Sequence, residues 1–299
     1  MKIGYPCLNR TIGCTPSSTF RLRSYSPARL QETVRQNLEC LGRILEFNLA
    51  KGLLFLRITS DLVPFASHPV CAFPWQEEFA GRFIALGSMM LRNGMRVSMH
   101  PDQFTLINSP DIAIFDRSSA ELAYHAEVLD LLGLDLTARI QIHVGGVYGD
   151  KKKSLERFCG RFEKLDEKIR RRLVVENDDR QYSVADCLQI SRCTGIPVLF
   201  DSFHHQLNGN GEALGTALSQ AAATWGKNDG LPMVDYSSQK QGERKGRHAE
   251  SIDLEDFAGF IAAGAGLDFD IMLEIKDKEK SALHARDFLV KMKRIGATS

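Results

Sequence analysis

Side chains that can bind metal ions recur where short apolar runs of the sequence end. Leu-Val-Val at 173–175 is followed by Glu176, and Ile-Met-Leu at 271–273 is followed by Glu274. Six runs end in this way, at His100, His143, Glu176, Asp201, Asp235 and Glu274. Burying several carboxylates together is costly unless cations compensate their charge. The pattern therefore predicts a metal centre built from carboxylates and imidazoles.

Two more histidines extend this set of candidate ligands. His204 follows Asp201 by three residues, and His248 lies in a long polar stretch after Asp235. Imidazoles and carboxylates without cysteines at the strand ends suit divalent ions such as Mn²⁺ or Zn²⁺ better than a structural thiolate site does. The set exceeds the needs of one ion, so we expect two or three divalent ions. Clustered ions of this kind are the usual device for hydrolysing a phosphodiester.

Each candidate ligand also has an ordinary structural role open to it. A single histidine at the end of a strand is more often a hydrogen-bonded core or rim residue than a metal ligand. Asp201, directly before Ser202, could cap a helix by accepting hydrogen bonds from its first amides. These roles do not explain why six apolar runs all end in a residue that can bind a metal ion. That repetition favours a shared site.

The runs that end in these residues belong to a regular alternation of β-rich and amphipathic segments. The β-rich runs are 2–5, 53–59, 96–100, 139–144, 173–177, 197–201, 231–235 and 269–275. Eight strand and helix units in order predict a (β/α)8 TIM barrel that forms a single domain over residues 1–299. In such a barrel the carboxyl ends of the strands surround one mouth, so the candidate ligands would meet there. An open doubly wound sheet gives similar local signals, but we find neither GxGxxG nor a P-loop and expect no nucleotide cofactor.

The segments between the strands and the overall composition fit this fold. We expect helices at 29–49, 77–92, 117–132, 155–170 and 184–193, where apolar residues recur at helical spacing. Seven cysteines without a CxxC pair indicate free thiols in a reducing compartment. The start of the chain reads as a short strand rather than a signal peptide, and no apolar run approaches the length of a membrane span. We therefore expect a cytoplasmic protein with no membrane contact, and a monomer.

Five short motifs, in order along the chain, resemble those of the UV damage endonuclease family. They are Gly4-Tyr5-Pro6-Cys7-Leu8-Asn9, Pro64-Phe65-Ala66-Ser67-His68-Pro69, Ser98-Met99-His100-Pro101-Asp102-Gln103-Phe104, Val175-Glu176-Asn177-Asp178 and Asp201-Ser202-Phe203-His204-His205. The resemblance runs nearly end to end and places the chain among endonuclease IV-like barrels. It implies a cut on the 5′ side of pyrimidine dimers and related lesions that leaves a 3′-hydroxyl.

The resemblance also implies roles for individual residues. Glu176 would bridge two ions, and His68 would lie beside the scissile phosphate. One ion would be completed by Asp201, Asp235 and Glu274, the second by His100 and His143, and a third would be held by His204 and His248.

One stretch departs from the pattern of the relatives. Many of them carry Lys-x-His at the end of the seventh strand, where this chain has Met233-Val234-Asp235. Asp235 adds a negative charge to the centre, which favours a hard, oxygen-preferring ion such as Mn²⁺ over Zn²⁺. We expect Asp235 to be a ligand, while the number of ions stays open between two and three.

Damaged double-stranded DNA is the partner we expect, although the net charge of +1 is low for a nucleic-acid-binding protein. The positive charges gather in loops that follow strands. Arg10, Arg21 and Arg23 follow the first strand, and Lys240, Arg244, Lys245 and Arg247 follow the seventh. Such clusters would bind phosphates without reading sequence. For the triplet Lys151-Lys152-Lys153, a solvent-exposed start of a helix is as good an explanation as contact with DNA.

Two further pairs are candidates for contact with the lesion. By the same resemblance, Phe104 would wedge between unstacked bases while Gln103 fills the space of the displaced nucleotides. Tyr5 and Asn9 would line the pocket for the flipped bases. For Tyr5 a plain core role explains the sequence nearly as well.

Three other functions compete with this interpretation. An apurinic-site endonuclease on the same barrel would share the metal centre and differ in the lesion pocket. A metal-dependent sugar isomerase would use similar ligands but would need neither the basic loops nor the Gln-Phe pair. A binding protein without catalysis would require the whole ligand set to be vestigial.

Overall fold

Eight parallel strands close into a barrel in the computed structural model, which describes residues 1–296. Each strand pairs with its neighbours in sequence, and β8 pairs with β1. The strands are β1 (Ile3–Pro6), β2 (Phe55–Ile58), β3 (Arg96–Met99), β4 (Arg139–His143), β5 (Leu173–Glu176), β6 (Val198–Asp201), β7 (Met233–Tyr236) and β8 (Asp270–Leu273). Each overlaps one of the eight runs expected from the sequence. The predicted TIM barrel is confirmed.

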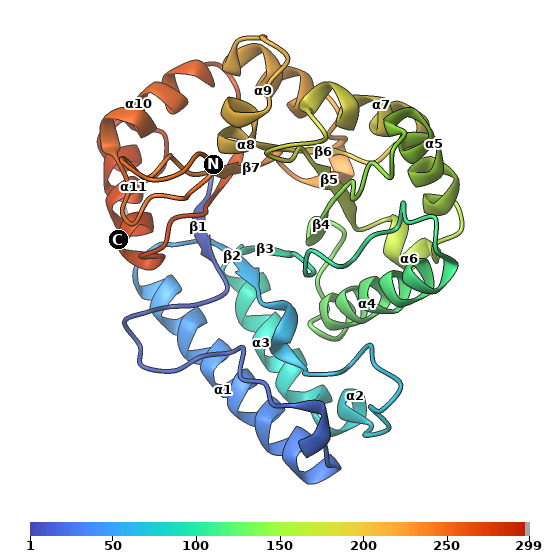
Figure 1. The fold of residues 1–299 in the computed structure, drawn as a ribbon. Helices are drawn as coiled ribbons and strands as arrows, with labels where there is room; N and C mark the ends of the chain where they lie inside the picture. Colours follow the sequence, from blue (N-terminus) through green and yellow to red (C-terminus); the bar gives the residue numbers. More distant parts are fainter. Residues whose placement is uncertain (297–299) are drawn as a thin grey trace.

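Helices surround the strands on all sides of the barrel, as Figure 1 shows. They are α1 (Pro27–Ala50), α2 (Trp75–Glu78), α3 (Ala80–Arg92), α4 (Ile112–Leu131), α5 (Lys151–Phe162), α6 (Glu167–Arg170), α7 (Val184–Thr194), α8 (Ser202–Leu207), α9 (Leu214–Ala222), α10 (Leu254–Ala263) and α11 (Glu279–Lys291). Short 3-10 turns lie at η1 (Leu22–Ser24), η2 (Ser60–Leu62) and η3 (Lys227–Asp229).

The helices expected at 77–92 and 155–170 were wrong in their extent, since the first range holds α2 and α3 and the second holds α5 and α6. In the second range, α6 starts anew after Asp166, whose side chain accepts a hydrogen bond from the amide of Lys168. An aspartate that accepts from the first amides of a helix is a start signal, and it was overlooked inside the longer apolar pattern.

One layer of the barrel interior consists of apolar side chains. Phe55, Val174, Leu199, Met233 and Met272 form this cluster, each from a different strand. Trp225 packs against the layer, and the guanidinium groups of Arg96 and Arg139 lie 5.7 and 5.9 Å from the centre of its ring. The layer seals the barrel, so chemistry is confined to its mouths.

Gly4 is required where β1 meets β2. A Cβ atom at this position would lie 1.6 Å from the carbonyl oxygen of Phe55. Only a residue without a side chain lets the two backbones approach this closely, so the closure of the barrel at β1 depends on this glycine.

Four of the seven cysteines are paired, which corrects the expectation of free thiols for these residues. Disulfides join Cys14 to Cys40 and Cys159 to Cys193, while Cys7, Cys71 and Cys187 are free. The first disulfide attaches the loop after β1 to α1, and the second joins α5 to α7. The partners are 26 and 34 residues apart in sequence, so no short spacing motif could reveal them. Within residues 1–296, no helix has the length and apolar character needed to cross a bilayer.

His125 should make the protein less stable in mild acid. Its ring is buried in α4, and this burial lowers its pKa from the usual 6.5 to about 4. Between these two values the unfolded chain binds a proton that the folded protein does not, so stability falls as pH falls through this window. From pH 7 to pH 5 the loss should be about 2 kcal/mol.

Urea unfolding at these two pH values, compared with His125→Gln, measures this contribution. The variant should lose about 2 kcal/mol less than the original protein. Glu121, whose own pKa is raised by burial, lies 3.5 Å from the ring of His125, so both proteins are also measured with Glu121→Gln to separate its contribution. An equal loss in both proteins would show that His125 does not titrate in this way.

Candidate active site

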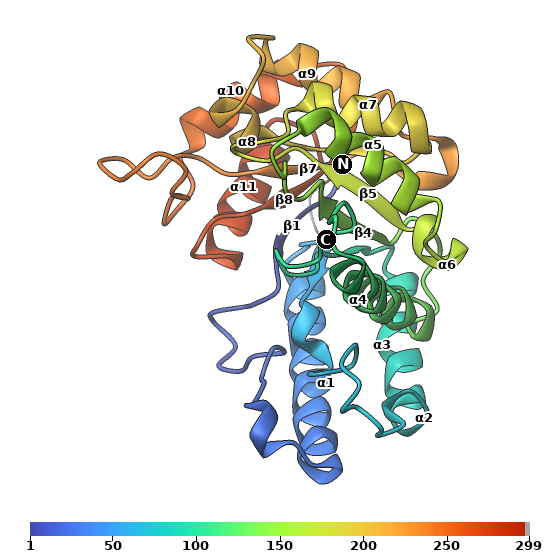
Figure 2. The same cartoon turned by 45° about the vertical axis from the view of Figure 1, so that its right-hand side comes forward.

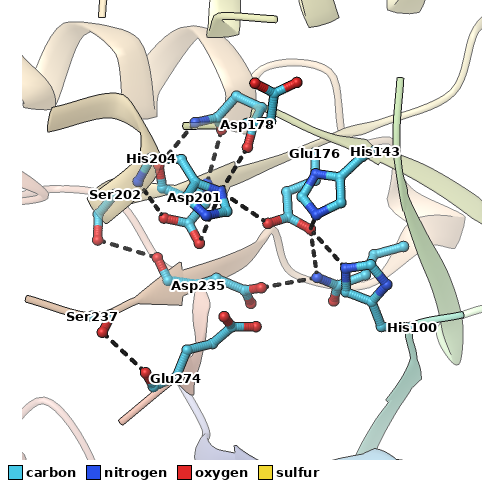
Figure 3. Close-up of polar contacts among 12 residues, drawn as sticks. His100, His143, Glu176, Asp178, Asp201, Ser202, His204, Asp235, Ser237 and Glu274 are labelled. Carbon is cyan, nitrogen blue, oxygen red and sulfur yellow. Dashed lines mark hydrogen bonds and ion pairs between the residues drawn. The ribbon is translucent and has the colours of Figure 1, made fainter. Parts of the chain in front are cut away.

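The alternation of side chains along the strands brings the predicted ligands together. Successive residues of a strand point to opposite faces, so a residue two positions after an interior apolar residue also points into the barrel. Glu176 follows Val174, Asp201 follows Leu199, Asp235 follows Met233 and Glu274 follows Met272 in this way. Figure 3 shows these carboxylates directed toward one centre, with His100, His143 and His204 beside them.

Glu176 lies at the middle of the centre and is 1% exposed. Its Oε2 lies 3.4 Å from Nε2 of His100 and 3.8 Å from Nε2 of His143. Its Oε1 lies 3.3 Å from Nδ1 of His204. The two oxygens of this carboxylate therefore face different histidines, His100 and His143 on one side and His204 on the other, so Glu176 is placed where a bridging ligand would lie.

The orientation of His100 is set by the backbone. Its Nδ1 lies 2.8 Å from the carbonyl oxygen of Pro101, which can only accept a hydrogen bond. Nδ1 therefore carries the proton, and Nε2, on the side of Glu176, keeps its lone pair. A backbone carbonyl that fixes the tautomer in this way is typical of histidine metal ligands.

Asp201 has the capping role that its sequence position allowed, and a free oxygen as well. Its Oδ1 accepts a hydrogen bond of 2.7 Å from the amide of His204 at the start of α8. Its Oδ2 is buried without a hydrogen-bond partner and lies 3.5 Å from Nδ1 of His204. Capping and metal binding are thus compatible here, because they use different oxygens.

Asp235 and Glu274 share a partner that the sequence interpretation missed. Nη2 of Arg57 lies 2.6 Å from Oδ2 of Asp235, and its Nη1 contacts Oε1 of Glu274. Gln141 adds a second link, since its Nε2 donates to Oε2 of Glu176 at 2.8 Å and to Oδ2 of Asp235 at 2.9 Å. Arginine and glutamine thus connect three of the four carboxylates.

The electrostatics of the centre show how strongly these groups affect one another. Burial and the neighbouring carboxylates raise the pKa of Asp201 well above its usual range, against the opposing effect of His204. Burial, opposed by Arg57, raises the pKa of Asp235 to about 7. Glu274 is half-buried, and although the loss of solvation raises its pKa, contact with Arg57 more than offsets this effect and the pKa falls to about 2. Four crowded carboxylates need more positive charge than Arg57 alone supplies.

The residues present fit divalent cations. Oδ2 of Asp201, Oδ1 of Asp235 and Nδ1 of His143 are buried without hydrogen-bond partners, which is rare for polar atoms in a folded protein. Three groups of residues have ligand atoms within 4.8 Å of one another: His100, His143 and Glu176; Glu176, Asp201 and His204; and Asp201, Asp235 and Glu274. Seven of the eight predicted ligands are in these groups.

His248 is the predicted ligand that lies outside them. Its Nδ1 is 2.8 Å from Oγ of Ser237 and 2.9 Å from the carbonyl oxygen of Glu274, and its ring packs on Phe203. A third ion held by His204 and His248 therefore stays a prediction that the three groups do not support. His68 lies in the exposed loop after η2, where its Nδ1 accepts a hydrogen bond from the amide of Val70, and its role also stays a prediction.

A cavity of about 540 Å³ opens beside the centre on the same mouth of the barrel. Its lining combines positively charged and neutral side chains, among them Cys7, Arg10, Gln103, Lys276 and Lys278, with the carboxylate of Glu274 and the imidazoles of His100, His143 and His248. Lys278 was not singled out in the sequence because it follows the last strand in a charged stretch. The cations around this cavity would favour an anionic substrate such as a phosphate backbone.

The basic loop after β7 forms an arm, defined here as residues 237–250. Gln239 and His248 form an antiparallel bridge, and the amide of Lys240 donates to the carbonyl of Arg247. Figure 2 shows the orange segment between β7 and α10 projecting away from the barrel. Arg244, Lys245 and Arg247 are exposed on it, whereas Lys240 is half-buried and paired with Glu250 at 3.0 Å.

The residues expected to contact a lesion are divided between surface and core. Phe104 is 72% exposed, which is unusual for a phenylalanine, and Gln103 lines the cavity. Tyr5 is fully buried, and its hydroxyl donates to Asn48 and accepts from Asn9. Neither Tyr5 nor Asn9 lines the cavity, so their place in a lesion pocket stays a prediction.

An eight-stranded β/α barrel with buried carboxylates and imidazoles at one mouth defines a class of barrel enzymes. Solved structures with low sequence identity share this fold. Endonuclease IV from Thermus thermophilus matches with a TM-score of 0.59 and 18% identity over 85% of this chain and 95% of that one. D-psicose 3-epimerase from Clostridium cellulolyticum matches with a TM-score of 0.55 and 16% identity over 82% and 91% of the two chains. Fold similarity at this level does not separate nucleases from sugar epimerases.

Closer relatives identify the family. The model of the UV-endonuclease UvdE family matches residues 1–299, so the chain belongs to that family and is an endonuclease. A protein named UV DNA damage endonuclease from Clostridium perfringens is 39% identical over 95% of this chain and 69% of its own length. The protein of the same name from Bacillus cereus strain Q1 is 36% identical over 96% and 94%. The crystal structure of SacUVDE matches with a TM-score of 0.94 and 43% identity over 99% and 100%.

Proposed function

We propose that the protein nicks double-stranded DNA on the 5′ side of pyrimidine dimers and related UV lesions, leaving a 3′-hydroxyl. The observation that carries the proposal is the centre of carboxylates and half-buried imidazoles at the open mouth of the barrel. The names of the relatives support UV-damaged DNA as the substrate. The position of the cut follows from the family resemblance of the motifs.

The centre is proposed to work with divalent ions, with Mn²⁺ preferred and Zn²⁺ as the alternative. When bound, such ions supply an activated nucleophile and neutralise charge on the attacking and leaving oxygens of the phosphodiester. Glu176 would bridge, since its two oxygens face separate groups. His100 and His143 would complete one site, and Asp201, Asp235 and Glu274 the other, with His204 next to Asp201. Carboxylate-rich groups favour Mn²⁺.

The surface around the mouth is proposed to hold the duplex. Arg10 lines the cavity, and the exposed cations of the arm would contact phosphates on either side of it. Phe104, which is exposed in the loop after β3, presents an aromatic face that can insert between unstacked bases. Gln103 lies next to it at the cavity, where it can occupy the space that displaced nucleotides leave.

Three duplexes of identical sequence test the substrate and the position of the cut. One carries a single thymine dimer, one a single abasic site, and one no lesion. With Mn²⁺ present we expect a nick directly 5′ to the dimer, mapped to the nucleotide, and little cutting of the intact duplex. Faster cutting at the abasic site than at the dimer would instead support an apurinic-site endonuclease. Absence of cutting in all three duplexes would contradict the proposal.

A further inference from the structure

Tyr148 is an exposed aromatic residue in the loop between β4 and α5. It is 44% exposed, and Phe104, in the loop after β3, is 72% exposed. The other phenylalanines, tyrosines and tryptophans among residues 1–296 are buried or half-buried. Strands β3 and β4 are neighbours in the barrel, so the two exposed rings lie on adjacent loops at the mouth that holds the carboxylates and imidazoles.

We propose that Tyr148 binds damaged DNA by stacking its ring on a nucleobase that leaves the helix at the lesion. This inference rests on the proposed function in taking a DNA duplex with a lesion as the substrate. Phe104 would open the stack of bases, and Tyr148 would offer an aromatic partner to a base that is set free. Every base has an aromatic face, so this contact requires no particular sequence.

The backbone and ring of Tyr148 are held in a fixed position. Its φ is +50°, in the left-handed region that side chains rarely adopt. The guanidinium carbon of Arg157 lies 5.4 Å from the centre of the ring. The ring also packs on Gly146, where a Cβ atom would lie 2.7 Å from a ring carbon. Such backbone strain persists only where the surrounding structure holds it, and it gathers at functional sites. A ring that is already fixed loses little freedom when a base stacks on it.

The loop of Tyr148 is joined to the loop of Phe104. Nδ2 of Asn108, in the loop after β3, donates to the carbonyl oxygen of Gly146 at 2.9 Å. Nε of Arg157 donates to the carbonyl oxygen of Asn108 at 2.5 Å. The two exposed rings therefore belong to one connected unit, so a base displaced by the first ring would meet the second at a fixed place.

The charge beside the ring suits a nucleic acid. Lys152 is exposed at the start of α5 and forms no ion pair within the part of the chain that the structure describes. Its neighbours Lys151 and Lys153 lie 2.6 Å from Asp186 and 3.5 Å from Asp150. The unpaired lysine of this triplet can bind a phosphate next to the stacked base, which adds affinity without reading sequence.

Affinity for three duplexes of identical sequence tests the contact, in the absence of divalent ions. One duplex carries a thymine dimer, one an abasic site and one no lesion. Tyr148→Leu should lower the affinity for the dimer duplex about tenfold, equivalent to about 1.4 kcal/mol, because the stacked ring is lost. Its affinity for the intact duplex should stay within about twofold. Tyr148→Phe, which keeps the ring, should bind all three duplexes as the original protein does.

Three results would overturn the proposal. The first is an unchanged affinity of Tyr148→Leu for the dimer duplex. The second is an equal loss of affinity for the dimer duplex and the intact duplex, which would indicate a general effect on DNA binding. The third is a loss in Tyr148→Phe as large as that in Tyr148→Leu, which would assign the effect to the hydroxyl group.

Two further variants control for folding and for loss of an exposed apolar side chain. Tyr148→Asn removes the ring with a residue that tolerates left-handed backbone, and it replaces Tyr148→Leu, with the same expected losses, if that variant fails to fold. Leu91→Asn changes an exposed residue at the end of α3, away from the mouth, and should bind as the original protein does. An equal loss in Leu91→Asn would contradict a specific contact at Tyr148.

The same measurements separate this proposal from the proposed function. If the original protein prefers the abasic duplex to the dimer duplex, the proposed function fails, and the loss in Tyr148→Leu is then expected on the abasic duplex. An original protein that prefers neither lesion to the intact duplex would overturn both proposals.

Discussion

Replacing Glu176 with alanine should lower nicking of a dimer-containing duplex by at least about 100-fold while DNA binding stays within about twofold. The carboxylate is 1% exposed, and its two oxygens face two separate groups of ligands. Without this carboxylate, each of the two groups of candidate ligands loses the residue that they share. Bound ions contribute several kcal/mol to such reactions, and each 1.4 kcal/mol is a factor of ten in rate.

The variant is assayed at saturating Mn²⁺, with circular dichroism as the check on folding. Glu176→Gln is the matched control, since it keeps the volume of the side chain and removes only its charge. We expect the glutamine variant to be nearly as inactive as the alanine variant. Retention of more than about a tenth of the original nicking rate in Glu176→Ala would remove Glu176 from the centre of the mechanism.

Reversing two charges on the arm should weaken binding to damaged and intact DNA alike. Lys245 and Arg247 are exposed there, and the nearby Glu243 already pairs with Arg247 at 3.3 Å. Lys245→Glu with Arg247→Glu removes up to two phosphate contacts and adds repulsion. Affinity should fall at least about tenfold at low salt, and the slope of log affinity against log salt should become shallower by about 0.9 for each lost contact.

A control variant with two substitutions at the other end of the barrel distinguishes contacts made by the arm from an effect of the net charge of the protein. Lys168→Glu with Arg171→Glu changes the net charge by the same amount, and both residues are exposed just before β5, away from the mouth. Its affinity for DNA should change much less than that of the arm variant. If both variants bind equally well, or both lose affinity equally, the arm makes no specific contact with the duplex.

The position of the centre could be predicted from the sequence because strand geometry is local. Side chains on a strand point alternately to its two faces, and the carboxylates at 176, 201, 235 and 274 each lie two positions after an apolar residue that points into the barrel. Arg57 follows Phe55 in the same register and was equally accessible to this argument. An arginine does not bind metal ions, so the pattern of candidate ligands at the strand ends did not include it.

Other features depend on contacts between residues that are distant in sequence. The disulfide between Cys14 and Cys40 forms only because the loop after β1 lies beside α1 in the folded protein. Gln141, in the middle of a strand, shows its role only once Glu176 and Asp235 are placed next to it. The sequence allowed a core role for Tyr5, which the structure bears out, but its hydrogen bond to Asn48 follows only from tertiary packing.

Removal and return of the metal ion tests the central claim most directly. Bound metal is removed from the protein with a chelator, and the chelator is then removed. The protein is incubated with a duplex that carries one thymine dimer, before and after addition of Mn²⁺. The account predicts no nicking by the stripped protein and recovery of the 5′ nick on addition of Mn²⁺, in proportion to the ions bound per chain. Nicking at the full rate by a protein shown by elemental analysis to contain no metal would contradict it.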